Sequence, residues 1–134
     1  MAKIVPTDLI SPHELPDQNF PFVLTTGRLL EHWHTGAMTR RSNTLDHIEP
    51  EAIVNMNRLD MKNLKLEPGN KVQVKTRRGS IELSVRQDTE LPKGMIFIPF
   101  CFSEAAANKL TNPQLDPFGK IPEFKYCAAN IEAC

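Results

Sequence analysis

The stretch VQVKTRRGSIELSV, residues 72–85, decides the fold class of this 134-residue chain. Apolar and polar residues alternate through 72–76 and again through 81–85, which is the period of a strand with one buried face. Between the two runs, Arg77-Arg78-Gly79-Ser80 supplies the polar, glycine-containing connection of a hairpin. The stretch therefore predicts two antiparallel β-strands joined by a short turn.

Working outward, short apolar runs predict four more strands, over residues 22–27, 52–56, 95–100 and 124–131. A short helix is predicted over 58–64, with Asn57 as its N-cap and Leu59 and Leu64 facing inward. A second is predicted over 104–110, capped by Ser103 and stopped by Pro113. Eleven prolines disfavour a long helical bundle. These elements together predict a compact β-barrel of mixed topology with short helices.

Residues 1–20 contain Pro6, Pro12 and Pro16 and few core residues, so no helix or strand is predicted there. We expect this stretch to be an extended lead-in, a linker from a preceding domain, with Met1 as an added start codon. The folded domain is then expected over residues 21–134.

Charge and composition exclude several function classes. Sixteen basic residues balance sixteen acidic ones, so no general electrostatic field favours nucleic acid or an anionic membrane. No apolar run reaches membrane-span length, and the N-terminus lacks a signal-peptide core. Cys101, Cys127 and Cys134 are too few and too widely spaced for a disulfide framework or a metal site, and Cys101 is expected to be a buried structural thiol. These features predict a cytoplasmic domain without nucleic-acid, membrane or metal partners held by its own residues.

Residues 28–50 are rich in basic and aromatic side chains and have no clear periodicity, which is typical of a functional segment. On a neutral protein, such a cluster predicts a specific phosphate-bearing ligand. The cluster consists of Arg28, His32, His34, Arg40 and Arg41.

Alternatives stay open for several of these residues. Arg40 and Arg41 are equally well explained as solvated surface charges. Trp33 is either a core residue, which the sequence favours, or a stacking surface for a planar ring. His32 and His34 could begin a zinc site, but no further ligand follows at a suitable spacing.

The sequence contains no GxSxG, HExxH, Walker or GxGxxG motif, and no pairing of carboxylates that predicts acid–base catalysis. No catalytic residue is therefore predicted. The residues alone predict a binding module for an anionic small molecule, with catalysis elsewhere.

The run TGRLLEHWHTGAMTRR, residues 26–41, resembles the C-terminal molybdopterin-guanine-dinucleotide-binding domain of molybdenum or tungsten oxidoreductases. The resemblance continues through residues 77–79, 94–100, 108, 110–111, 115–117 and 120–128, and it covers nearly the whole chain from about residue 20. It implies a six-stranded double-psi β-barrel and, as cofactor, molybdopterin guanine dinucleotide (the bis form, with molybdenum or tungsten).

The resemblance also implies which residues contact the cofactor. Arg28 and Lys125 would neutralise phosphate charge, and Asn108 would hydrogen-bond ring or ribose groups, while the aromatic residues would close over the ligand. The implied contacts are Thr26, Gly27, Arg28, His32, Trp33, His34, Thr35, Phe100, Asn108, Phe124 and Lys125.

Residues 110–124 look most similar to the catalytic subunits of cytoplasmic NAD-dependent formate dehydrogenases, which implies oxidation of formate to carbon dioxide as the parent reaction. The implied partners are the remaining domains of that subunit and iron–sulfur or flavin electron-transfer subunits. The family's iron–sulfur cysteines and metal ligand have no counterpart here, so we expect no catalysis by this chain alone. The alternatives are a nitrate reductase-like parent, or a stand-alone small subunit or interaction module that holds the dinucleotide; a hydrolase on the same type of barrel would need a catalytic Asp or Ser that no motif indicates.

Overall fold

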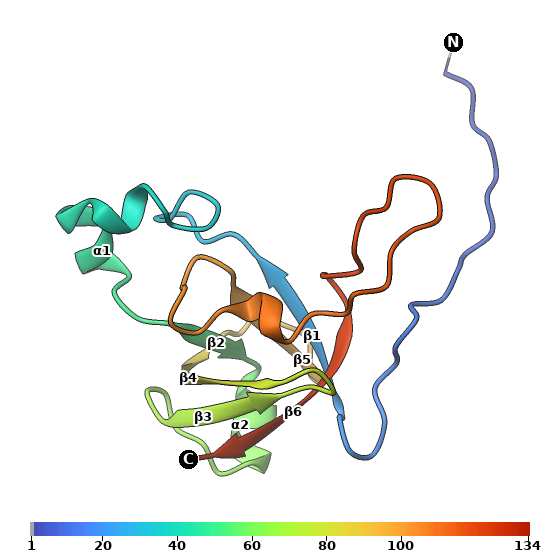
Figure 1. Cartoon of the computed structure of the whole chain (residues 1–134). Coiled ribbons are helices and arrows are strands. Elements are labelled where there is room, and N and C mark those ends of the chain that lie inside the picture. Colours follow the sequence, from blue (N-terminus) through green and yellow to red (C-terminus); the bar gives the residue numbers. More distant parts are fainter. Residues whose placement is uncertain (1) are drawn as a thin grey trace.

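Six strands close into a barrel in the order β1-β5-β2-β4-β3-β6, in a computed structural model that describes residues 2–134 (Figure 1). The strands are β1 Phe22–Gly27, β2 Ile53–Met56, β3 Lys71–Lys75, β4 Ser80–Gln87, β5 Met95–Pro99 and β6 Cys127–Ala133. The helices are α1 Asn43–Ile48 and α2 Arg58–Asn63, with single 3₁₀ turns η1 Thr39–Arg41 and η2 Ala107–Lys109. Closure leaves no strand edge unpaired.

The pairing is mixed. β1 runs parallel to β5, and β2 runs parallel to β4, while the other four contacts around the barrel are antiparallel. The expected fold class, a mainly β, six-stranded barrel of the double-psi type with short helices, is confirmed.

The predicted hairpin is present as β3 and β4. Val74 lies opposite Ile81 and Val72 opposite Leu83, and all four side chains are buried in the barrel. In the turn, Thr76 N–H donates to the Gly79 carbonyl over 2.9 Å. The alternating residues therefore form one wall of the core, as their period requires.

Helix α2 begins as predicted, because the Asn57 Oδ1 accepts a 2.8 Å hydrogen bond from Leu59 N–H. The prediction that Leu59 and Leu64 face inward is wrong, since both side chains are exposed. The helix instead buries Met61 together with Asp60, whose carboxylate accepts a 2.7 Å hydrogen bond from Gly94 N–H. In a helix this short, the direction of the preceding strand decides which side faces the barrel, and the positions of the apolar residues do not.

The predicted helix over 104–110 is also wrong, because only η2 forms there. Ser103 makes no cap, and Arg40 pairs with the Glu104 carboxylate. Ala105 and Leu110 are buried in the core, so tertiary packing overrides the helix propensity of the alanine run. Conversely, α1 and η1 lie in the 28–50 segment, where the sequence showed no period.

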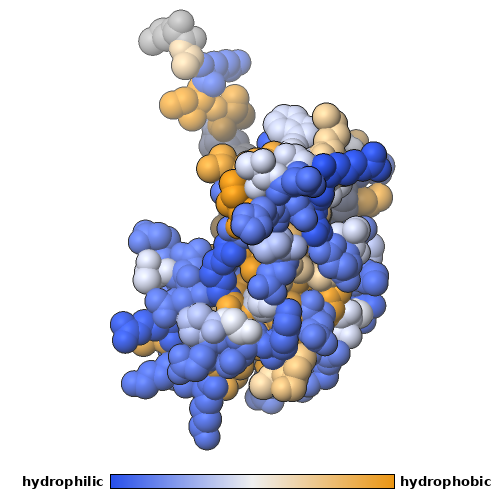
Figure 2. All heavy atoms as spheres, turned by 90° about the vertical axis from the view of Figure 1, so that its left-hand side faces the viewer, coloured by the Kyte–Doolittle hydropathy of each residue, from blue (hydrophilic) through white to orange (hydrophobic). Residues whose placement is uncertain are grey.

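Residues 2–20, which belong to the lead-in, form no helix or strand. The outer part of the lead-in extends away from the barrel (Figure 1) and exposes Ile4, Val5, Leu9 and Ile10. Hydrophobic atoms, coloured orange, lie along this extension in Figure 2. Across residues 2–134, no helix has the length and apolarity that a membrane crossing requires.

Candidate functional site

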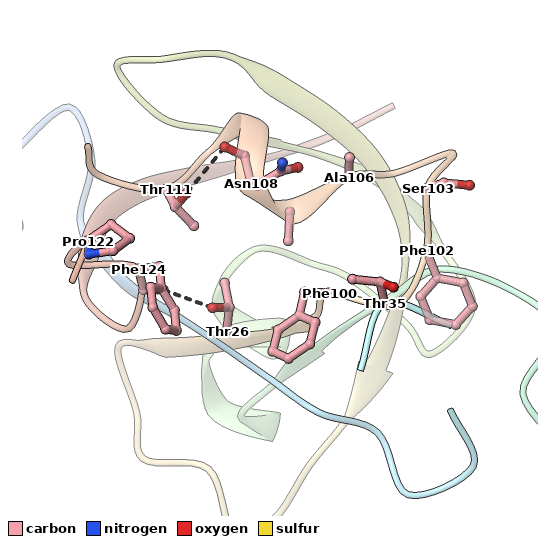
Figure 3. Close-up of a pocket in the computed structure, with 11 residues that line it drawn as sticks. Thr26, Thr35, Phe100, Phe102, Ser103, Ala106, Asn108, Thr111, Pro122 and Phe124 are labelled. Atoms are coloured by element: carbon pink, nitrogen blue, oxygen red, sulfur yellow. Dashed lines mark hydrogen bonds between the residues drawn. The ribbon is translucent and has the colours of Figure 1, made fainter. Parts of the chain in front are cut away.

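A cavity of about 520 Å³ opens between the end of β1, the segment that follows β5, and the segments before β6 (Figure 3). Its volume lies within the range of roughly 300–1,000 Å³ that is usual for small-molecule sites. Its lining is mostly apolar with a few hydroxyl and amide groups. The lining residues are Thr26, Thr35, Phe100, Phe102, Ser103, Ala106, Ala107, Asn108, Thr111, Pro122 and Phe124.

Two hydrogen bonds join the end of β1 to the segment before β6. The Thr26 hydroxyl donates to the Phe124 carbonyl over 2.8 Å, and Lys125 Nζ donates to the Thr26 carbonyl over 2.6 Å. Phe100 N–H donates to the Gly27 carbonyl, which brings the segment after β5 to the same place. The fold thus gathers these five predicted residues from three distant parts of the sequence.

The amide of Asn108 is the most versatile polar group at the cavity. Asn108 lies in η2, is exposed and lines the cavity, so its side chain can both donate to and accept from a ligand. Thr111 lies beside it and donates its hydroxyl to the Asn108 carbonyl over 3.2 Å. The two residues form a polar edge on an otherwise apolar wall.

A second cavity, of about 610 Å³, brings together four more of the predicted residues, whereas Gly27 and Lys125 line neither cavity. It is lined by Arg28, His32, Trp33 and His34 together with Leu29, Leu30, Glu31, Thr39 and Leu45. Trp33 is 62 % exposed, so the core interpretation that the sequence favoured is wrong. The Arg28 guanidinium carbon lies 6.0 Å from the Trp33 ring centre, and the His34 ring meets Trp33 edge-on.

His32 is enclosed by protein. Nε2 lies 2.8 Å from the Glu49 carbonyl, and Nδ1 lies 3.3 Å from the Thr39 hydroxyl, while the ring packs edge-on against Phe102. Both ring nitrogens are therefore occupied, and only 1 % of the residue is exposed. In this arrangement His32 positions the 28–50 segment, and its predicted contact with a cofactor stays a prediction.

Arg40 is neither solvated nor free to bind an anion. Its guanidinium donates to Asp46 over 2.9 Å and to Glu104 over 2.6 Å, and it stacks on the Phe102 ring at 4.8 Å. Arg41, by contrast, is exposed and has no ion-pair partner among residues 2–134. Arg28, which lines the second cavity, and Lys125, which donates to the Thr26 carbonyl at the first, likewise have no carboxylate partner within the described part of the chain. Either cation could therefore pair with a ligand phosphate.

Cys101 is buried, as predicted, and burial raises the pKa of its thiol to about 11. A thiol with so high a pKa is not a nucleophile near neutral pH. Over residues 2–134, no three His, Cys, Asp or Glu side chains gather where they could hold a metal ion.

Residues 22–128 match the Molydopterin dinucleotide binding domain family. The chain belongs to this family. The match spans both cavities and every residue that the sequence assigned to the cofactor, from Thr26 to Lys125.

The curated relatives that the chain matches are formate dehydrogenase alpha subunits. The chain is 47 % identical over 131 residues to the F420-dependent formate dehydrogenase subunit alpha of Methanocaldococcus jannaschii. The aligned region covers 98 % of this chain and 20 % of that protein. It is 41 % identical over 132 residues to the F420-dependent formate dehydrogenase 1 subunit alpha of Methanococcus maripaludis, again over 20 % of that protein. The chain thus spans about a fifth of the length of these relatives. Their names specify F420, so the NAD dependence that the resemblance implied has no support from them.

Among solved structures, acetylene hydratase from Pelobacter acetylenicus superposes with a TM-score of 0.76 over 86 % of this chain and 18 % of that one. The two sequences are only 20 % identical, so the likeness concerns the fold alone.

The residues present fit a pterin dinucleotide. Apolar walls with a polar edge suit a planar ring and a ribose, and two unpaired cations suit a pyrophosphate. The sequence analysis missed six residues that line the first cavity, all of which lie between the predicted residues Phe100 and Phe124. They are Phe102, Ser103, Ala106, Ala107, Thr111 and Pro122. Thr111 fell inside a quoted stretch of the resemblance, but only the folded wall shows that it faces the cavity.

Proposed function

We propose that this domain holds the guanine dinucleotide end of a bis(molybdopterin guanine dinucleotide) cofactor inside a formate dehydrogenase alpha subunit. The observation that carries the proposal is the cavity where Thr26, Phe100, Asn108 and Phe124 converge from segments far apart in the sequence. All four were assigned to the cofactor on the resemblance alone. Membership of the dinucleotide-binding family and the identity to formate dehydrogenase alpha subunits support it.

The residue roles follow from chemistry and exposure. Arg28 and Lys125 pair with phosphate oxygens, because both are exposed and neither is neutralised by a carboxylate among residues 2–134. The Lys125 ammonium uses one donor on the Thr26 carbonyl and keeps others for a ligand. Asn108 reads polar groups of the base or ribose, and the exposed ring of Trp33 stacks on a planar ring.

The proposed parent reaction is the oxidation of formate to carbon dioxide. When bound, the molybdenum or tungsten centre supplies the two-electron chemistry; this chain supplies one wall of the cofactor site. The remaining domains of the alpha subunit and iron–sulfur or flavin subunits are the proposed partners. F420 is the better supported electron acceptor, because the relatives' names specify it. The cytoplasm is the proposed compartment, which the three free cysteines support.

The test is a titration of the chain with GDP, followed by the NMR shifts of its backbone amides. We expect shifts concentrated at Thr26, Thr35, Phe100, Asn108 and Phe124. Substituting Asn108→Ala should weaken GDP binding by about tenfold, the effect of removing one hydrogen bond to a polar ligand. GMP, which lacks the terminal phosphate, should bind more weakly than GDP.

The matched control is Asn63→Ala, which removes an exposed amide at the end of α2, outside both cavities. Binding should be unchanged in this variant. Equal losses in the two variants, or shifts scattered over the barrel, would contradict the proposed site. No shifts at millimolar GDP would contradict the proposal that this chain binds the nucleotide by itself.

A further inference from the structure

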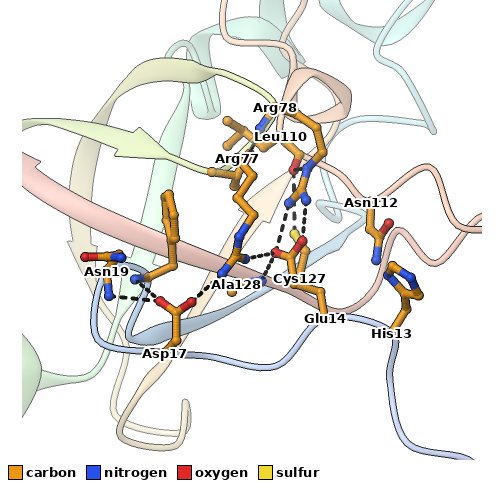
Figure 4. A network of polar contacts seen from close by, with 12 residues as sticks. His13, Glu14, Asp17, Asn19, Arg77, Arg78, Leu110, Asn112, Cys127 and Ala128 are labelled. Carbon is orange, nitrogen blue, oxygen red and sulfur yellow. Dashed lines mark hydrogen bonds and ion pairs between the residues drawn. The ribbon is translucent and has the colours of Figure 1, made fainter.

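Glu14, in the lead-in, forms an ion pair with Arg78, in the turn between β3 and β4 (Figure 4). The pair is bidentate: Nη1 and Nη2 of Arg78 each donate to one oxygen of the Glu14 carboxylate. The side chain of Glu14 is only 11 % exposed, and that of Arg78 is 21 % exposed. Such fork-shaped, partly buried pairs fix geometry better than exposed single contacts do.

The third nitrogen of the Arg78 guanidinium contacts the cavity wall that carries Asn108 and Thr111, from the side away from the cavity. This nitrogen, Nε, donates to the Leu110 carbonyl over 3.0 Å. Leu110 is fully buried and lies directly between the cavity residues of η2 and Thr111. The position of this carbonyl therefore sets where the side chains of Asn108 and Thr111 enter the cavity.

Glu14 also contacts the start of β6, because Ala128 N–H donates to its carboxylate over 2.7 Å. Arg77 adds a second cation at 3.1 Å. Burial alone raises the pKa of the Glu14 carboxyl, but the hydrogen bonds from Arg78 and Ala128 and the charges of the two arginines outweigh it and hold the pKa below its usual value. Glu14 is therefore ionised, and paired, at neutral pH.

The neighbouring residue holds the opposite wall. His13 N–H lies 3.2 Å from both carboxylate oxygens of Glu123, which also accepts a 2.9 Å hydrogen bond from the Asn112 amide. Glu123 lies between Pro122 and Phe124, both of which line the cavity. Consecutive residues of the lead-in thus attach to both walls from outside.

We propose that His13 and Glu14 are positioning residues for the dinucleotide cavity, which they hold through Glu123 and Arg78, respectively. Residues 2–11 are exposed, but residues 13 and 14 work as part of the binding domain. The inference rests on the proposed function for its ligand, whereas the attachment itself is a property of the free chain.

The first test is hydrogen exchange of the free chain at backbone amides that are hydrogen-bonded in each wall. These are Lys109 and Leu110 on one side and Glu123 and Phe124 on the other. Glu14→Gln should speed exchange at the first pair by about tenfold, because local opening of that wall becomes easier. His13→Pro removes the backbone N–H that donates to Glu123, whereas His13→Ala loses the same imidazole and keeps that N–H. Only the proline variant should speed exchange, and only at the second pair.

The matched control is Glu82→Gln, which removes an exposed carboxylate on β4 that makes no ion pair among the described residues. It should leave exchange in both walls unchanged. Uniformly faster exchange across the barrel in Glu14→Gln would show a general loss of stability and would overturn the proposal.

The second test measures GDP binding. Glu14→Gln should weaken binding by about five- to tenfold, although Glu14 does not line the cavity. If Glu14 acts through the wall that carries Asn108, the losses from Glu14→Gln and Asn108→Ala should combine to less than their sum in free energy. Fully additive losses would overturn the positioning role. A wild-type chain that fails to bind GDP would contradict binding of the nucleotide by this chain by itself, while the exchange test, which needs no ligand, would still decide the attachment.

Discussion

At the scale of single residues, Arg28 and Arg78 use the same guanidinium in opposite ways. Arg28 is exposed beside Trp33 and has no carboxylate partner within residues 2–134, whereas Arg78 is committed to Glu14 and the Leu110 carbonyl. A cation that directly contacts a phosphate contributes more to binding than one that positions a wall.

We therefore predict that Arg28→Ala weakens GDP binding by about tenfold or more, the value of a charge-assisted hydrogen bond, and more than Arg78→Ala does. The order reverses for stability, where Arg78→Ala should cost about 1–3 kcal/mol because it removes the bidentate partner of the partly buried Glu14 carboxylate. Isothermal titration and urea unfolding measure the two effects. The same order in both assays would contradict the division of roles.

Gly27 was singled out by the resemblance as a cofactor contact, but the structure gives it a role in packing. An added Cβ at this position would lie 2.5 Å from Cε2 of the Phe97 ring. The glycine is needed because that ring covers the end of β1. Resemblance identified the position, and only the packing reveals its role in the free chain.

We predict that Gly27→Ala lowers the free energy of unfolding by about 1 kcal/mol or more, since the half-buried Phe97 ring must shift. Adding Phe97→Leu should recover part of the loss, although that substitution alone is destabilising. Urea midpoints of the single and double variants test this. Additive losses in the double variant would argue against a clash with the ring.

At the scale of elements, the sequence pattern correctly predicted those strands whose formation depends on a few adjacent residues. Alternation fixed β3 and β4, and a glycine ended β1, because each depends on a few adjacent residues. The helix predicted over 104–110 does not form because Glu104 pairs with Arg40 and Leu110 is buried in the core. Neither contact can be inferred from the local sequence.

The cap of α2 gives a prediction at this scale. Asn57 accepts from Leu59 N–H with Oδ1 and donates Nδ2 to the Leu91 carbonyl over 2.7 Å, so it joins the helix to the loop before β5. Asn57→Ala should cost about 1–2 kcal/mol of unfolding free energy. Asn57→Asp, which keeps the capping acceptor and loses the donor, should cost less. Equal losses would mean that the contact with Leu91 outweighs the cap.

At the scale of the whole molecule, the candidate site could not be assembled from local patterns. Thr26 and Phe124, which share a hydrogen bond at the cavity, are 98 residues apart, and His13 and Glu123 are 110 apart. No period or spacing connects such residues, so the resemblance alone brought Asn108, Phe124 and Lys125 into the predicted set. The attachment of the lead-in escaped both approaches, because Glu14 belongs to no motif and lies in a stretch that resembles a linker.

That attachment makes the stability of the molecule depend on pH. The pKa of the Glu14 carboxyl lies below its ordinary value of 4.5 because its hydrogen bonds from Arg78 and Ala128 outweigh the effect of burial. A carboxyl whose pKa falls on folding contributes stability that is complete above its unfolded pKa and disappears as the pH falls through its folded pKa. Wild type should therefore exceed Glu14→Gln by about 2 kcal/mol at pH 7, the value of hydrogen bonds to a charged group.

The difference should stay constant between about pH 6 and 8 and shrink below about pH 4.5, where the protonated carboxyl comes to resemble the amide of the variant. Asp116, whose pKa is lowered by the backbone N–H groups of Ile121, Gly119 and Phe118, lies in a separate loop and serves as the control. Its Asp116→Asn variant should lose stability with a similar pH profile while leaving hydrogen exchange at Leu110 unchanged. Urea unfolding across this pH range measures both differences. A difference for Glu14→Gln that persists undiminished at pH 3 would mean that the side chain stabilises the molecule by its shape, and that its charge does not hold the lead-in to the barrel.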